Sequence, residues 1–293
     1  MLWIFISLLA AAFFAIVNAT DKFTLQKWIK NPVILLMAFG VTGMAMAMGI
    51  YAVHGFSYLS EANIWIAFLG GFFFILSSFF YLKAVKAEEV SRVMPLNSFN
   101  TLFVLFLASA FLGEIFPPGK YLGVAFLFAG AFMISTKSFR KIRFGKGAVF
   151  IIFSALAFAV GNVITKHLLN FADYWTVFSY VRIGSFIPII PVLHFGFRDL
   201  KAVARSSRKV ASVVFFNRIL GLTGLLLVAL AASMGQISLV SALIATQTLF
   251  LLGITLCLSS FYPHILKEEM DSRTTLIKII ATALIFVGVF LIA

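Results

Sequence analysis

The chain is a succession of apolar stretches close to 20 residues long, separated by short segments that carry charges or turn-forming residues. A helix of about 20 apolar residues spans a hydrocarbon layer roughly 30 Å thick. Within that layer every backbone N–H and C=O group must be paired inside the protein, which leaves helices and closed β-barrels. The stretches are continuous and too long for the alternating strands of a barrel. With 62% hydrophobic and 11% charged residues, the sequence predicts an all-α integral membrane protein.

Ten such helices fit the 293 residues and leave no room for a separate soluble domain. The first stretch has no basic leader and no small-residue cleavage site, so we interpret it as a retained helix and not as a signal peptide. The predicted helices cover residues 2–19, 32–53, 63–82, 89–112, 119–136, 147–168, 172–195, 210–234, 237–261 and 273–292.

Two stretches in the first half of the chain recur, in the same order, in the second half. Residues 11–25 align with 155–169 at an offset of 144, and residues 91–105 align with 238–252 at an offset of 147. The first alignment includes the identical pairs Ala11/Ala155, Phe14/Phe158, Ala15/Ala159, Asn18/Asn162 and Lys22/Lys166. A half-length repeat in an apolar chain is typical of secondary transporters. We therefore predict two five-helix repeats, at residues 1–137 and 147–293, joined by a basic loop at 138–146.

The lysines and arginines gather in every second loop. Of the 23, only Lys120, Lys166, Arg182 and Arg218 fall elsewhere. Because short cytoplasmic loops are enriched in these residues, we expect the basic loops in the cytoplasm and both termini on the other side. An odd number of helices per repeat then turns the second half upside down relative to the first. The net charge of +13 is thus explained by topology and headgroup contact, and no nucleic-acid partner is expected.

The segment from Tyr81 to Ser135 has a tyrosine and an alanine near the end of the third predicted helix, followed by Pro95, the pair Gly113–Glu114 and a last helix that contains glycine. This pattern resembles the end of a repeat in the ten-helix, EamA-like branch of the drug/metabolite transporter superfamily. The second half matches more loosely, with Glu268 or Glu269 at the glutamate position. The resemblance implies a secondary transporter of the prokaryotic inner or plasma membrane that exports amino acids or related metabolites.

Matched amides are the first candidates for a solute site. Asn97 and Asn100 share a helical face, and Gln247 occupies the position of Asn100 in the second repeat. Asn18 and Asn162 are a second matched pair. Such amides at the meeting point of two repeats are what a polar solute needs, and hydrogen bonding between helices is the alternative.

Arg182 and Arg218 lie well inside the seventh and eighth predicted helices. Because a charge inside the bilayer is costly, it is usually kept for a pathway or a partner. The functional interpretation is an anion-attracting cavity. The alternative is an ion pair with Glu88 or Glu89, or extension of Arg218 towards the headgroups.

Aromatic rings with polar tips are candidates for the cavity wall, and we select Tyr81, Tyr180 and Trp175. Three acids, Glu114, Glu268 and Glu269, are candidates for coupling to a proton or ion, although helix ends beside short turns are the other interpretation. The histidines have no ligand spacing, so no metal site is expected. No nucleotide-binding loop or nucleophile signature occurs, so we expect neither a cofactor nor an enzyme.

The sequence therefore predicts a transporter that moves a small metabolite, by efflux, through alternating access between inverted repeats. Its expected partners are the solute, membrane lipid and, as an open alternative, a coupling proton or ion. A carrier of organic anions or phosphorylated metabolites that uses Arg182 and Arg218 is the alternative within the same class. A receptor or assembly partner that transports nothing is the alternative from another class.

Overall fold

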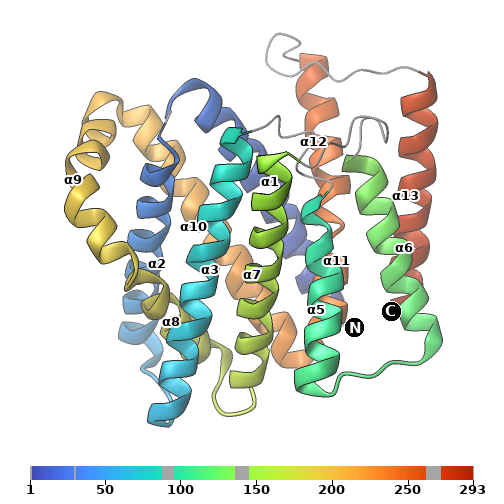
Figure 1. Ribbon diagram of the computed structural model, residues 1–293, viewed down its shortest axis with the longest axis horizontal. Coiled ribbons are helices and arrows are strands. Elements are labelled where there is room, and N and C mark those ends of the chain that lie inside the picture. The colour runs from blue at the N-terminus through green and yellow to red at the C-terminus, as the bar shows by residue number, and fades with distance from the viewer. Residues whose placement is uncertain (1, 30, 88–95, 136–144, 262–271, 293) are drawn as a thin grey trace.

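The computed structural model describes residues 2–29, 31–87, 96–135, 145–261 and 272–292, and within these ranges the secondary structure is helical (Figure 1). The helices are α1 (Leu2–Lys27), α2 (Pro32–His54), α3 (Glu61–Ala87), α5 (Phe99–Leu112), α6 (Pro118–Ser135), α7 (Lys146–Leu168), α8 (Tyr174–Phe186), α9 (Ile189–Ser206), α10 (Arg208–Met234), α11 (Ile237–Ile244), α12 (Gln247–Phe261) and α13 (Ser272–Ile292).

Six spans in the described ranges are long and apolar enough to cross a membrane. The pair α8 and α9 adds a bent span, and α5, α6 and α13 contain three shorter apolar helices. These segments correspond one to one with the ten predicted from sequence. The protein is thus an all-helical integral membrane protein, as predicted, while ten crossings and their alternating direction stay predictions.

Four of the predicted helices differ from their expected form. α1 continues to Lys27 instead of ending near residue 19, and α3 continues to Ala87 instead of ending near residue 82. The seventh predicted helix bends by 46° between α8 and α9, where Pro188 cannot donate a backbone hydrogen bond. The ninth divides into α11 and α12, and the hydroxyl groups of Thr246 and Thr248 bond to the carbonyls of Leu243 and Ala245 at this break. Hydroxyl groups that compete for backbone carbonyls often bend a helix.

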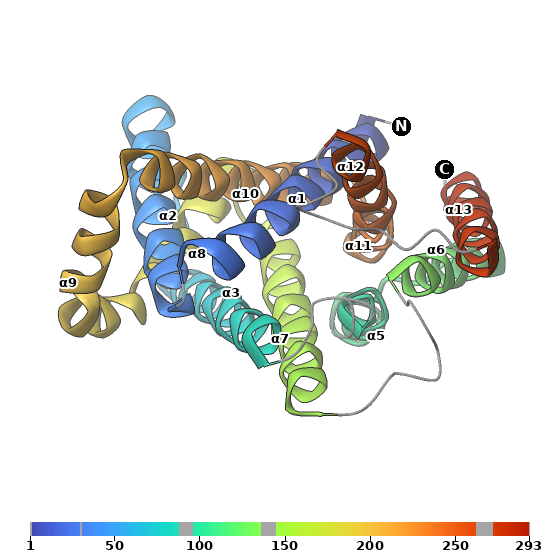
Figure 2. The ribbon, with the colours of Figure 1, turned by 90° about the horizontal axis from the view of Figure 1, so that it is seen from above.

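The helix pairs in contact are exchanged between the two halves of the chain. α3 packs on α7 as α10 packs on α1, so the third helix of each half lies against the first helix of the other. The equivalent helices α6 and α13 pair with each other, as Figure 2 shows from above, and so do α2 and α8. Gly123 of α6 and Gly288 of α13 permit the contact between these two helices. A Cβ on either glycine would lie within 3.0 Å of the carbonyl oxygen of the other. This packing is what two equivalent repeats would give.

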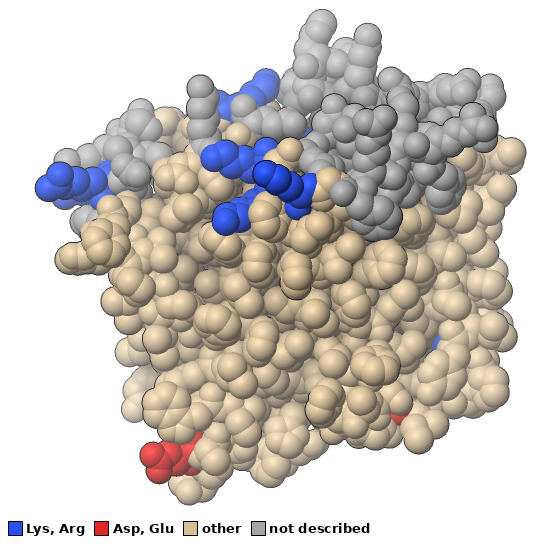
Figure 3. All heavy atoms as spheres, in the orientation of Figure 1, with Lys and Arg blue, Asp and Glu red and all other residues tan. Residues whose placement is uncertain are grey.

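Most of the lysines and arginines visible in Figure 3 lie at one end of the molecule, and the visible acidic side chains lie at the other. The basic end is where α1 and α3 end and where α7 and α10 begin (Figure 1). Lys27, Lys83, Lys86, Lys146 and Arg208 are exposed there. These described residues come from four of the loops that the sequence groups as basic, and they share one face of the fold.

The end opposite the basic face is closed by small buried side chains. Ala10 and Ala11 of α1 pack there with Ala159 of α7 and with Ala231 and Ala232 of α10, and all five are fully buried. Because alanine side chains are short, the helices approach one another closely. This tight packing leaves the free volume in the basic half of the molecule.

Candidate solute-binding cavity

A partly open cavity of ≈ 190 Å³ lies between the two halves of the chain. Its walls come from the later parts of α1 and α3, the first parts of α2, α5 and α7, the middle of α10, and the break between α11 and α12. Most of these segments lie towards the basic end (Figure 1). The polar lining consists of Asn18, Asp21, Ser77, Ser78, Tyr81, Asn97, Ser98, Asn100, Thr101, Ser154, Asn217, Arg218, Ser241, Gln247 and Thr248. The structure thus brings six of the predicted residues together: Asn18, Tyr81, Asn97, Asn100, Arg218 and Gln247.

Three of the predicted amides form hydrogen bonds between the two halves at the cavity. Asn18 Nδ2 donates a hydrogen bond to Gln247 Oε1 at 3.3 Å, which joins the first half to the second. Asn100 Nδ2 donates to Ser241 Oγ at 3.2 Å and also bridges the halves. The Asn100 Oδ1 atom is buried without a partner in the described structure. Because a buried acceptor without a donor is costly, this oxygen is a ready point of attachment for a solute N–H or O–H.

Asp21 is the residue that sequence reasoning missed. Its carboxylate pairs with the Arg218 guanidinium and accepts a second hydrogen bond, at 2.7 Å, from Asn217 Nδ2. The two charged side chains are nearly buried, with Asp21 3% and Arg218 7% exposed. Asp21 follows Asn18 by three residues on one helical face, so a longer first helix in the prediction would have indicated it. The described acid beside Arg218 is therefore Asp21, whereas Glu88 and Glu89 lie outside the described residues.

Four predicted site residues lie outside this cavity. Arg182 and Asn162 line a separate, smaller cavity. Trp175 stacks on His54 with ring centroids 4.7 Å apart, and Tyr180 contacts Phe56 at 5.1 Å. The aromatic pairs connect α8 to the end of α2 and the loop that follows it, so their observed contacts are those of packing between the halves.

Glu114 has a structural contact at the closed end. Its carboxylate accepts hydrogen bonds from the backbone N–H groups of Ile237 at 2.8 Å and Ser238 at 3.0 Å, and from Ser238 Oγ at 2.6 Å. A carboxylate at this position satisfies the free N–H groups at the start of α11 and complements the helix dipole. Glu114 is only 6% exposed and does not line the central cavity. The other two candidate coupling acids, Glu268 and Glu269, lie outside the described residues.

Asp173 forms a contact between the two halves outside the membrane-spanning segments. Asp173 caps α8 by accepting hydrogen bonds from the backbone N–H groups of Trp175 and Thr176, and it also accepts from the hydroxyl groups of Ser57 and Thr176. Partial burial acts to raise the pKa of Asp173, but these hydrogen bonds outweigh it and hold the pKa below its usual value. The carboxylate form of Asp173 thus ties the loop after α2 to the start of α8.

Known proteins resemble this chain in sequence and in fold. Residues 1–136 match the model of the EamA-like transporter family. An "Uncharacterized transporter YxxF" of Bacillus subtilis (strain 168) is 27% identical over 135 residues, which are 44% of this chain and 43% of that protein. The chain thus aligns with less than half of the length of this relative. A solved structure described as "Crystal structure of protein" superimposes with a TM-score of 0.69 over 99% of this chain and 94% of its own, at 16% identity.

The fold match covers nearly the whole chain, and the family match covers its first repeat. The first repeat is the part whose residues carried the resemblance most clearly, from Tyr81 to Ser135. Residues 1–136 are therefore similar to the EamA-like transporter family, in agreement with the resemblance to the drug/metabolite transporter superfamily that the sequence pattern indicates.

Proposed function

We propose that the protein is a secondary transporter that exports a small neutral or zwitterionic solute, such as an amino acid, by alternating access. The observation that carries the proposal is the composition of the central cavity. Its described lining has one acid, Asp21, and one base, Arg218, which balance each other, together with the amides Asn18, Asn100 and Gln247. An α-amino acid carries the same two charges and hydrogen-bonding groups.

The ion pair supplies a binding mode for such a solute. The Asp21 carboxylate can accept hydrogen bonds from an ammonium group, and the Arg218 guanidinium can donate to a carboxylate. A zwitterion that enters between them replaces one internal contact with two of its own, so no charge is left unpaired. A purely anionic solute would leave Asp21 without a cation. The balanced charge therefore favours a zwitterion over the organic or phosphorylated anions of the alternative.

The packing of the two ends supports a direction of access. The cavity lies in the basic half, and the positive-inside rule predicts the cytoplasm on that side. The other end is closed by the alanine-rich packing and by the hydrogen bonds of Glu114 to α11. We therefore propose that this conformation faces the cytoplasm of a prokaryotic inner or plasma membrane, and that both termini lie outside.

Counterflow into proteoliposomes tests the proposal. Vesicles loaded with an unlabelled amino acid should accumulate the labelled one when they contain the purified protein. Asn100→Ala keeps the ion pair and should raise the half-saturating concentration by up to about tenfold, the equivalent of one hydrogen bond. Tyr180→Phe removes a hydroxyl group outside the cavity and is the matched control.

Two results would contradict the proposal. Counterflow that is equal with native protein and with empty vesicles, across neutral and zwitterionic solutes, would exclude the substrate class. A receptor or assembly partner predicts, in addition, that no solute changes the labelling of cysteines introduced at Asn100 or Gln247, whereas alternating access requires such a change.

A further inference from the structure

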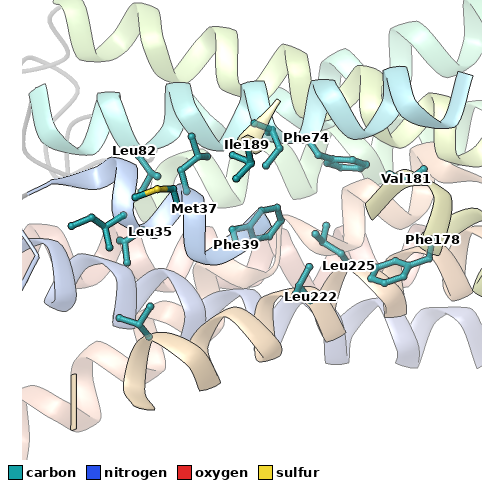
Figure 4. Packing of buried hydrophobic residues seen from close by; sticks show 14 of the residues in the cluster. Leu35, Met37, Phe39, Phe74, Leu82, Phe178, Val181, Ile189, Leu222 and Leu225 are labelled. Atoms are coloured by element: carbon teal, nitrogen blue, oxygen red, sulfur yellow. The ribbon is translucent and has the colours of Figure 1, made fainter. Parts of the chain in front are cut away.

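Arg182 is a buried cation that the described structure leaves without an anion. The side chain is 1% exposed, and its Nε and Nη1 atoms have no hydrogen-bond partner. Three aromatic rings surround the guanidinium, with centroids 4.8 Å away for Phe74, 5.4 Å for Phe178 and 5.7 Å for Phe39. Figure 4 shows these rings, from α3, α8 and α2, converging on one region. Aromatic faces attract a cation but do not neutralise it, so the charge still requires an anionic partner.

Arg182 borders a second space that is small and partly open. It lines this cavity of ≈ 20 Å³ together with Asn162 and Thr165 of α7. A cavity needs about 10–15 Å³ to hold one water molecule, so this one has room for one small group, such as a halide ion or the end of a carboxylate whose remainder extends through the opening. Ser179 Oγ, one turn before Arg182 on α8, is also buried without a partner. Unsatisfied donors thus gather on one side of α8.

The internal repeat allows the lining of this cavity to be compared with that of the central one. At the offset of 144, Asn162 and Thr165 occupy the positions of Asn18 and Asp21. In the first repeat, that asparagine and that acid line the central cavity, and the acid supplies a carboxylate to Arg218 of α10. In the second repeat a threonine stands at the position of the acid. Arg182 of α8 is not the repeat counterpart of Arg218, but it lines the cavity of this threonine, and no described residue of that lining supplies a carboxylate.

We propose that the Arg182 cavity binds one small anion, which is either a halide ion or the carboxylate group of a solute. The guanidinium donates to the anion through Nε and Nη1, and the Asn162 amide can add a third donor. Phe74 and Leu225 line both cavities. Movement of these two side chains would connect the anion site with the central cavity.

Thermal unfolding of the purified protein tests the site at constant ionic strength, with chloride or bromide replacing gluconate, which is too large for the cavity. At a halide concentration about 100 times its dissociation constant, the melting temperature should be roughly 5 °C higher than in gluconate, and it should increase with the logarithm of the halide concentration. Arg182→Met should abolish the rise. Arg218→Met replaces the paired arginine in the same way and should keep it.

Glycine and acetate, added in gluconate buffer, distinguish the two sources of the anion. A rise with these carboxylates that depends on Arg182, together with displacement of bromide, assigns the site to the carboxylate of a solute. A rise with halides alone assigns it to an inorganic ion.

The first repeat suggests a variant that remains informative if Arg182→Met fails to fold. Thr165→Asp restores the acid of the first repeat and nearly preserves side-chain volume. It should raise the melting temperature in gluconate and make it insensitive to halide, because the cavity then contains its own carboxylate. An anomalous bromide peak beside Arg182 in crystals of the native protein is the direct observation.

Equal melting temperatures in halide, carboxylate and gluconate, or a halide response that survives Thr165→Asp unchanged, would overturn the assignment. Binding is measured at equilibrium without transport. A negative result here therefore leaves the proposed function untouched, and failed counterflow leaves the anion site untouched.

Discussion

The Asp21–Arg218 pair allows a prediction in which a second substitution repairs the damage of the first. Both side chains are nearly buried, and the Arg218 Nε atom already has no partner in the described structure. Asp21→Asn removes the counter-charge and leaves a buried guanidinium. Removing one member of a buried pair costs about 3–5 kcal/mol, so the free energy of unfolding should fall by that amount.

Arg218→Met should cost less than Asp21→Asn. Asp21 keeps its hydrogen bond from Asn217 at 2.7 Å, and a carboxylate without its cation can be neutralised by taking up a proton. We expect a loss of about 1–3 kcal/mol, one hydrogen bond to a charged group and its desolvation, which becomes smaller in acid. The double variant contains no buried charge at this site. It should therefore be more stable than Asp21→Asn alone, with a coupling energy of about 1–3 kcal/mol.

Reversible unfolding in mixed detergent and SDS micelles measures all four proteins of this cycle. Tyr180→Phe, outside the cavity, is the control for an unrelated substitution. If adding Arg218→Met to Asp21→Asn lowers stability further, by the sum of the single effects, the two side chains are not coupled and the buried pair does not exist as described.

Three further predictions concern packing and the closed end. Gly71→Ala should destabilise the protein by about 1–3 kcal/mol, because the added Cβ would lie 2.3 Å from backbone atoms of α8. Gly49→Ala, whose Cβ would have no atom within 4 Å, should be neutral or stabilising. Melting curves of both variants test this, and equal effects on the melting temperature would contradict the described packing. Glu114→Gln should lower the free energy of unfolding by about 1–3 kcal/mol by weakening the cap of α11. Counterflow by this variant should depend on pH in the same way as counterflow by the native protein; a different pH dependence would make Glu114 a coupling residue. The depressed pKa of Asp173 stabilises the folded protein at pH values above the unfolded pKa of 3.8, and this stabilisation declines as the pH falls below that value. Asp173→Asn should remove it, so the melting temperatures of the native protein and the variant should converge in acid. A difference that stays constant with pH would refute this linkage.

The helical membrane fold could be predicted because hydrophobic run length in a bilayer is a strong constraint on a single segment. The breaks could not all be predicted: Pro188 indicates one, but the division near Thr246 depends on hydroxyl groups that bond to backbone carbonyls, which many unbroken helices also contain. The cavity residues on matched positions, Asn18, Asn100 and Gln247, were accessible through the repeat. Asp21 was not selected, because it lies beyond the predicted end of the first helix near residue 19 and because its pairing with Arg218 of α10 has no local sequence signal.

Arg182 and Arg218 also show that tertiary contacts cannot be predicted from local sequence. Both are arginines inside apolar helices, and the sequence treats them alike. The structure distinguishes them by their tertiary contacts. Arg218 pairs with an acid from α1, whereas Arg182 contacts aromatic rings from three helices. Local composition predicts that such a charge needs compensation, but only the fold shows where the compensation comes from.

The contact of Gly123 with Gly288 bears on the history of the duplicated chain. Each glycine leaves the space that the other's carbonyl oxygen occupies, so neither can gain a side chain unless the partner backbone moves. After duplication, the two copies could diverge around the cavities, where Asp21 and Thr165 now differ. At this contact a side chain added in one half requires a backbone shift in the other, so the two glycines restrict each other's substitution.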